Sequence, residues 1–157
     1  MRPDVIVNAA ACAAVDRAES EPGLATAING TAPGVLAEES KHLGALLVHD
    51  STDYVFDGAK VAPYTEDDPP NPLSVYGRSK LEGKRAIEAS GCRQLTLRTS
   101  RVYTGRGHNF RLTMLRLGAE RPELRVVDDP RGAPTSAGTS PRRRRNSSGA
   151  LRTGGFA

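Results

Sequence analysis

The sequence is poor in aromatic residues, cysteine and long apolar runs. It has no tryptophan, aromatic residues make up 4% and hydrophobic residues 38%, which suffices for one modest core. No apolar run approaches the roughly 20 residues that a membrane-spanning helix needs. The first residues do not resemble a signal peptide, because only three apolar residues precede Asn8. Cys12 and Cys92 do not make a disulfide framework, so we expect a reduced, cytoplasmic protein.

Acidic residues are missing from the C-terminal tail, and this explains the positive net charge. Five of the 22 basic residues and none of the 18 acidic residues lie in 136–157. Residues 1–135 therefore hold 17 basic and 18 acidic side chains, a net charge of −1. The body gives no reason to expect a specific nucleic-acid partner. The tail, rich in Arg, Ser and Gly, is predicted to be disordered.

Apolar runs alternate with helical patterns through residues 1–135. Pro22 suits a first helical turn, Gly44 and Gly91 suit helix ends, and Ser74 is a good N-cap. Strand–helix alternation predicts an α/β fold with a parallel sheet and flanking helices. We expect strands near 4–9, 45–50, 94–98 and 124–127, and helices near 22–43, 74–90 and 109–120. Gly30, Pro33 and Gly34 interrupt the helix over 22–43 and predict either a kink or a division into two pieces.

The spacing of Tyr76 and Lys80 suggests a proton-transfer pair. On a helix these residues lie one turn apart on the same face. A nearby cation favours the phenolate, so Lys80 is expected to lower the pKa of Tyr76. The pair can then exchange a proton with a substrate oxygen. Thr52, which ends a strand-like run, adds a hydroxyl able to bind the same oxygen.

Two of these patterns have plainer explanations. A lone Tyr-x-x-x-Lys arises often by chance in an amphipathic helix. The small residues after the first strand can line a cofactor or simply pack; they are Ala9, Ala10, Ala11, Cys12 and Ala13. A hydroxyl at a strand end facing a Tyr/Lys helix is nevertheless the arrangement of short-chain dehydrogenases/reductases, whose ligands sit at the carboxyl ends of parallel strands.

Several longer motifs together resemble the dTDP-4-dehydrorhamnose reductases, an extended short-chain dehydrogenase/reductase family. The similarity covers roughly residues 3–135. The motifs are DVIVNAAA at 4–11, AVDRAE at 14–19, STDYVFDG at 51–58, YGRSKL at 76–81, LRTS at 97–100, NF at 109–110, TML at 113–115, VDD at 127–129 and GAPT at 132–135. The fold that this implies is an incomplete Rossmann-like domain over 1–135, followed by a disordered basic tail over 136–157.

The resemblance also implies an activity. Members reduce the 4-keto group of dTDP-6-deoxy-L-lyxo-4-hexulose with NADPH or NADH to form dTDP-L-rhamnose, a precursor of cell-wall polysaccharide. Tyr76 would protonate the 4-oxygen. Lys80 would lower the pKa of Tyr76 and hold the nicotinamide ribose. Thr52 would hydrogen-bond the keto oxygen, with Asp53 beside it near the sugar. The segment 9–13 would line the cofactor. Full-length members also imply a possible Mg²⁺ ion, for which no ligands are identified here, and a possible homodimer.

The chain departs from the family at several positions. Compared with the family, we expect the Gly-rich strand–turn–helix that begins the cofactor-binding half to be missing. The position of a sugar-packing Trp holds Arg101, and Asp50 replaces an aromatic residue. Arg101 is therefore the candidate substrate contact there. After Thr135 the similarity stops, and the tail looks like translation in a shifted frame. We expect weak NADPH binding and little turnover from this chain alone.

Two other functions stay open. A related nucleotide-sugar epimerase or dehydratase would share Tyr76, Lys80 and the cofactor, although the motifs at 51–54 and 132–135 favour the reductase. A non-catalytic remnant whose basic tail binds polyanions is the other.

Overall fold

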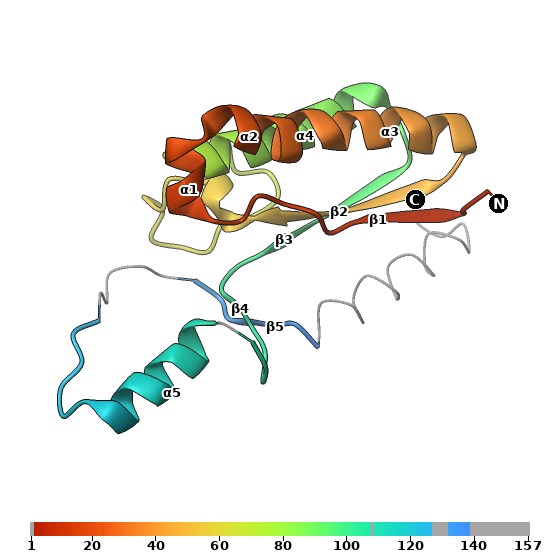
Figure 1. The fold of residues 1–157 in the computed structure, drawn as a ribbon. Coiled ribbons are helices and arrows are strands. Elements are labelled where there is room, and N and C mark those ends of the chain that lie inside the picture. The colour runs from red at the N-terminus through yellow and green to blue at the C-terminus, as the bar shows by residue number, and fades with distance from the viewer. Residues whose placement is uncertain (1, 108, 127–131, 139–157) are drawn as a thin grey trace. The chain divides into compact units, whose positions relative to one another are not determined.

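The computed structural model describes residues 2–107, 109–126 and 132–138 and divides into two compact units, Met1–Arg98 and Thr99–Ala157. The first unit contains three strands with the order β1-β2-β3 and a set of helices (Figure 1). Its elements are β1 (Val5–Asn8), α1 (Val15–Ser20), α2 (Pro22–Thr26), the π-helical turn η1 (Ala27–Thr31), α3 (Ala32–Leu43), β2 (Leu46–Thr52), the 3-10 turn η2 (Asp53–Val55), α4 (Val75–Ser90) and β3 (Gln94–Thr99).

The sheet of the first unit has the predicted parallel arrangement. β1 pairs in parallel with β2, from Val5 opposite Leu46 to Asn8 opposite His49. In Figure 1 the helices lie over one face of this sheet. The apolar core between them is formed by Ala37, Leu47 and Ile87, all buried, with partly buried residues around them. The α/β class predicted from the sequence is confirmed.

Local capping signals set the helix ends where the sequence predicts them. The Ser74 side chain accepts a hydrogen bond from the Gly77 amide at 3.0 Å and starts α4. Gly44 and Gly91 end α3 and α4 with φ angles of 67° and 68°, a left-handed conformation that glycine adopts without strain.

The predicted kink is a π-helical turn rather than a break. Pro33 has no N–H, so the Asn29 carbonyl cannot receive its usual bond from that position. The chain widens over η1 and continues directly into α3. The Asn29 carbonyl faces Gly83 of α4, where a Cβ atom would overlap it. This contact lets α4 lie close against the turn.

Two sequence predictions need correction, and the short helix α1 was not predicted. β1 is less buried than expected, because Val7 is half-exposed. The strand expected at 124–127 is absent from the described part of that segment, 124–126, and Val127 lies outside the described residues.

The second unit contains a helix and a two-stranded parallel sheet. α5 (Phe110–Glu120) begins as predicted, because the Asn109 side chain accepts a bond from the Leu112 amide at 3.1 Å. β4 (Val102–Tyr103) pairs with β5 (Thr135–Ser136). Ser136, expected in the disordered tail, therefore lies in a strand. Residues 139–157 lie outside the described residues, and the division of the chain at 135 stays a prediction.

Candidate active site

Helix α4 carries both members of the predicted Tyr/Lys pair in its first two turns. Tyr76 is partly exposed and Lys80 is almost completely buried. Between them, Gly77 faces the Tyr54 carbonyl so closely that a Cβ atom would overlap it. Glycine at this position therefore allows the start of α4 to approach the segment after β2.

The carboxyl end of β2 supplies Thr52, as predicted. Its hydroxyl donates to an Asp53 carboxylate oxygen at 3.1 Å and accepts from the Tyr54 amide at 3.2 Å, which starts η2. The nearby Thr52 hydroxyl also acts to lower the pKa of Tyr76. The Tyr54 ring meets the Tyr76 ring edge-on, with centroids 5.5 Å apart. Thr52, Asp53 and Tyr76 are thus brought together.

The electrostatics of Tyr76 differ from the sequence-based prediction. The pKa of Tyr76 is raised, first by burial and then by electrostatic interaction with Asp53, Tyr54 and Cys12, against an opposing effect of the nearby Thr52 hydroxyl. The expected lowering by Lys80 is wrong for this ligand-free chain. The raised pKa keeps the phenol protonated at neutral pH, which is the form that donates a proton.

Lys80 points into the sheet. Its amine donates to the Asp50 carbonyl oxygen at 2.7 Å and lies 3.4 Å from His49 Nε2. Burial lowers the pKa of Lys80 to about 8, against the opposing charge of Asp50. Burial, and then the nearby Lys80, lower the pKa of His49 to about 4. His49 is therefore neutral at physiological pH.

The segment 9–13 follows β1 at the same end of the sheet. Its four alanines are exposed and Cys12 is partly buried. Asn29 of η1 links the segment to α4: it accepts from the Cys12 amide at 2.9 Å and donates to the Cys12 carbonyl and to the Ser79 hydroxyl of α4, both at 3.1 Å. Small exposed residues fit a site that a flat cofactor approaches closely. Whether they bind one stays a prediction.

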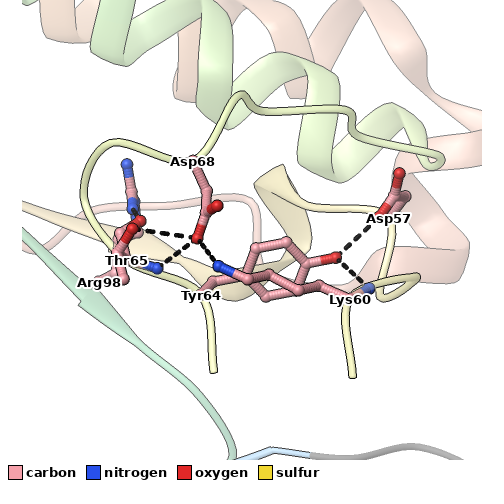
Figure 2. A network of polar contacts seen from close by, with 6 residues as sticks. All are labelled: Asp57, Lys60, Tyr64, Thr65, Asp68 and Arg98. Carbon is pink, nitrogen blue, oxygen red and sulfur yellow. Dashed lines mark hydrogen bonds and ion pairs between the residues drawn. The ribbon is translucent and has the colours of Figure 1, made fainter. Parts of the chain in front are cut away.

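The loop between η2 and α4 is ordered by a polar network (Figure 2). Asp57 accepts from the Tyr64 hydroxyl at 2.8 Å and from Asn71 at 2.9 Å. These bonds, after a larger contribution from the Ala59 amide, lower the pKa of Asp57 to about 2. The Lys60 amine contacts an Asp68 oxygen at 2.6 Å. The acidic loop is therefore structured and fixes the approach of the chain to α4.

Beneath that loop an aromatic stack links it to β3. The Phe56 and Tyr64 rings are stacked with centroids 4.1 Å apart, and the Arg98 guanidinium lies 4.8 Å from the Phe56 centroid. Arg98 also donates to the Thr65 carbonyl at 3.4 Å.

The predicted sugar contact of Arg101 and the predicted metal ion stay untested. Arg101 belongs to the second unit and has a strained φ of 44°; its contact with a sugar stays a prediction. Among the described residues, no group of three or more His, Cys, Asp or Glu side chains is arranged to hold a metal ion. The Mg²⁺ ion implied by the resemblance also stays a prediction.

Sequence reasoning missed Asn8, His49, Asn29 and Gly77. His49 carried one usable signal, since it is a polar residue continuing the apolar run of β2. Asn29 and Gly77 gave none, because their partners, Cys12 and Tyr54, are distant in sequence.

Comparison with known proteins agrees with the motifs. The RmlD substrate binding domain family matches residues 1–143. Curated dTDP-4-dehydrorhamnose reductases from Burkholderia thailandensis and Salmonella typhimurium are 54% and 52% identical over 87% of this chain and 46% of each relative. The crystal structure of such a reductase from Bacillus anthracis, in complex with NADP, has a TM-score of 0.89 and 39% identity, over 94% of this chain and 52% of that chain.

The chain spans about half the length of the curated relatives it matches. Within the described residues, no helix is long and apolar enough to cross a membrane. The family match extends over nearly the whole sequence and includes both units. The chain belongs to the RmlD substrate binding domain family.

Proposed function

We propose that this chain carries the proton-donating half of a dTDP-4-dehydrorhamnose reductase. The reaction is the NADPH-dependent reduction of the 4-keto group of dTDP-6-deoxy-L-lyxo-4-hexulose to dTDP-L-rhamnose. The main support is the convergence of Thr52, Asp53 and Tyr76 at the carboxyl end of β2, where Thr52 acts to lower the pKa of Tyr76, with the buried Lys80 one turn further along α4. The reductase identity of the relatives adds to this support.

The roles of the side chains follow from their protonation states. Tyr76 is held as a phenol and donates its proton to the 4-oxygen as negative charge develops there. The Thr52 hydroxyl turns from Asp53 towards the same oxygen and stabilises that charge. Lys80 lies one turn after Tyr76 on α4. Its role is to help Tyr76 regain a proton after the transfer. NADPH, when bound, supplies the hydride for the carbonyl carbon, and segment 9–13 with Lys80 would hold it.

A chimera tests the proposal in a complete reductase. Residues 1–135 of this chain replace the matching segment of the Salmonella typhimurium relative, and NADPH oxidation is followed with the dTDP-keto sugar. The chimera should form dTDP-rhamnose. Tyr76→Phe should lower kcat by about 10²–10⁴-fold because it removes the proton donor. Tyr64→Phe is the matched control, since it removes a phenol hydroxyl from the loop and should leave kcat within a few-fold.

Two outcomes contradict the proposal. One is a folded chimera that binds NADPH without reducing the sugar. The other is full activity in Tyr76→Phe. Conversion of UDP-sugars without net NADPH oxidation would instead identify an epimerase.

We further propose a reducing, cytoplasmic location, supported by the free thiols of Cys12 and Cys92. Homodimer formation stays a prediction.

A further inference from the structure

A chain of hydrogen bonds runs from the backbone of segment 9–13 to the amine of Lys80. Its first link is the Ala10 amide, which donates to Asn8 Oδ1 at 3.2 Å. A backbone N–H can only donate, so it fixes the orientation of the Asn8 side-chain amide. The oxygen faces Ala10, and the nitrogen Nδ2 faces His49.

The second link fixes the tautomer of His49. Asn8 Nδ2 lies 3.1 Å from His49 Nδ1. Because Nδ2 is a donor, Nδ1 must accept and carries no proton. The neutral imidazole has one N–H, which is then on Nε2. Asn8 and His49 face each other in the β1–β2 register, and both side chains are buried.

The third link meets Lys80. The Nε2–H of His49 points to an amine nitrogen 3.4 Å away. An ammonium group would set two donors against each other there, whereas an uncharged amine offers a lone pair to accept the N–H. The amine keeps its own N–H for the Asp50 carbonyl.

We infer that Asn8 and His49 are positioning residues that present an N–H donor to Lys80 and favour its uncharged amine in the ligand-free chain. Two titratable groups act on Lys80 from β2, His49 by contact and Asp50 by its charge. Tyr76 lies one turn away on α4, with Asp53 beside it. The lowered pKa of Lys80, about 8, agrees with the geometry. The importance of Lys80 rests on the proposed function, but the tautomer does not.

Nitrogen NMR on the chain of residues 1–157, without added ligand, tests this inference directly. With ¹⁵N-labelled protein, the shifts and long-range proton couplings of the two ring nitrogens of His49 distinguish the tautomers. We expect the Nε2–H form from pH 6 to pH 9. An Nδ1–H form, or a protonated ring, at pH 7 would overturn the inference. The measurement needs neither substrate nor turnover, so failure of the reductase assay does not affect it.

In the variant Asn8→Asp, the group that faces His49 Nδ1 changes from a hydrogen-bond donor to an acceptor. The carboxylate can still accept from Ala10, and it can only accept from His49, so the ring proton should move to Nδ1. The side-chain carbon shifts of Lys80, followed against pH, should then report a pKa at least roughly one unit higher. Asp50→Asn is the control: it should lower the pKa of Lys80 and leave His49 in the Nε2–H form.

Circular dichroism establishes first that each variant is folded. A folded Asn8→Asp in which His49 keeps its proton on Nε2 would overturn the inference. If Asn8→Asp does not fold, the tautomer of the unchanged chain still decides it.

Discussion

Gly83 should be intolerant of alanine although it lies inside a helix. An ideal Cβ at Gly83 would overlap the Asn29 carbonyl oxygen and would lie 3.2 Å from both the Asn29 carbonyl carbon and Pro33 Cγ. Two of these three neighbours are backbone atoms and cannot rotate away. The chain offers a matched control in Gly23 of α2, where no described atom lies within 4 Å of the added Cβ.

Two opposing effects decide whether Gly83→Ala raises or lowers the free energy of unfolding. Alanine is favoured over glycine in a helix by about 1 kcal/mol. Overpacking a tight contact costs roughly 1–3 kcal/mol, and contact with fixed backbone places this case near the upper value. The expected net loss is therefore about 2 kcal/mol for Gly83→Ala. Gly23→Ala lacks the overlap and should gain roughly 0.5 kcal/mol from the reduced freedom of the unfolded chain.

Urea unfolding measures both changes. The chain has no tryptophan, so the transition is followed by circular dichroism and by tyrosine fluorescence. With an m-value of about 2 kcal/mol/M, the midpoint should fall by roughly 1 M in Gly83→Ala and rise by roughly 0.2–0.3 M in Gly23→Ala. A Gly83→Ala midpoint at or above that of the unchanged chain would refute the close approach of α4 to η1.

Two further predictions concern pH. His49 is neutral in the folded chain, with a pKa lowered from 6.5 to about 4, so the unfolded chain binds the extra proton between these values. The free energy of unfolding should therefore fall by roughly 2–3 kcal/mol as the pH drops from 7 to 4, a loss that urea titrations should show to be smaller in His49→Gln. Asp57 is an acid whose pKa is lowered from 3.8 to about 2 in the folded chain. Its contribution to the stability of the loop is therefore present above pH 4 and is lost as the pH falls through 2. Proteolysis of the loop 57–72 by pepsin should accelerate over that interval, whereas Asp57→Ala should be cleaved rapidly already at pH 4 and Asp67→Ala, which removes an exposed acid from the same loop, should behave like the unchanged chain.

Local signals were sufficient for the element bearing the candidate site. Ser74 and Gly91 mark the ends of α4 within the sequence itself, and the Tyr76–Lys80 spacing places both side chains on that helix. Strand–helix alternation likewise predicted β1, β2 and β3. These features depend on neighbours a few residues apart, which is the range over which a sequence pattern carries information.

Features that depend on tertiary distance could not be predicted. The Asn8–His49 contact exists because the register places these residues opposite each other, 41 positions apart in the chain. The predicted effect of Lys80 on Tyr76 was wrong for the same reason. Helical spacing gives the separation of Cα atoms, but burial and the Asp50 carbonyl determine where the amine points. The pairing of β4 with β5 also joins distant segments and has no local pattern.

The distribution of polarity along β1 and β2 argues that this end of the sheet is built for chemistry. At their amino ends the strands bring Val5 beside Leu46, and the core continues through Leu47. At their carboxyl ends the same strands bury Asn8, His49 and Thr52, and α4 adds Lys80. Burying polar groups costs free energy unless each is hydrogen-bonded, and apolar residues of similar size would avoid that cost. Asn8, His49 and Lys80 bond to groups of the sheet, the segment 9–13 or α4, and Thr52 bonds to Asp53 and Tyr54 of η2. Folding of the sheet therefore fixes Lys80 and Thr52 before any ligand arrives, because the bonds that offset their burial are also the bonds that position them.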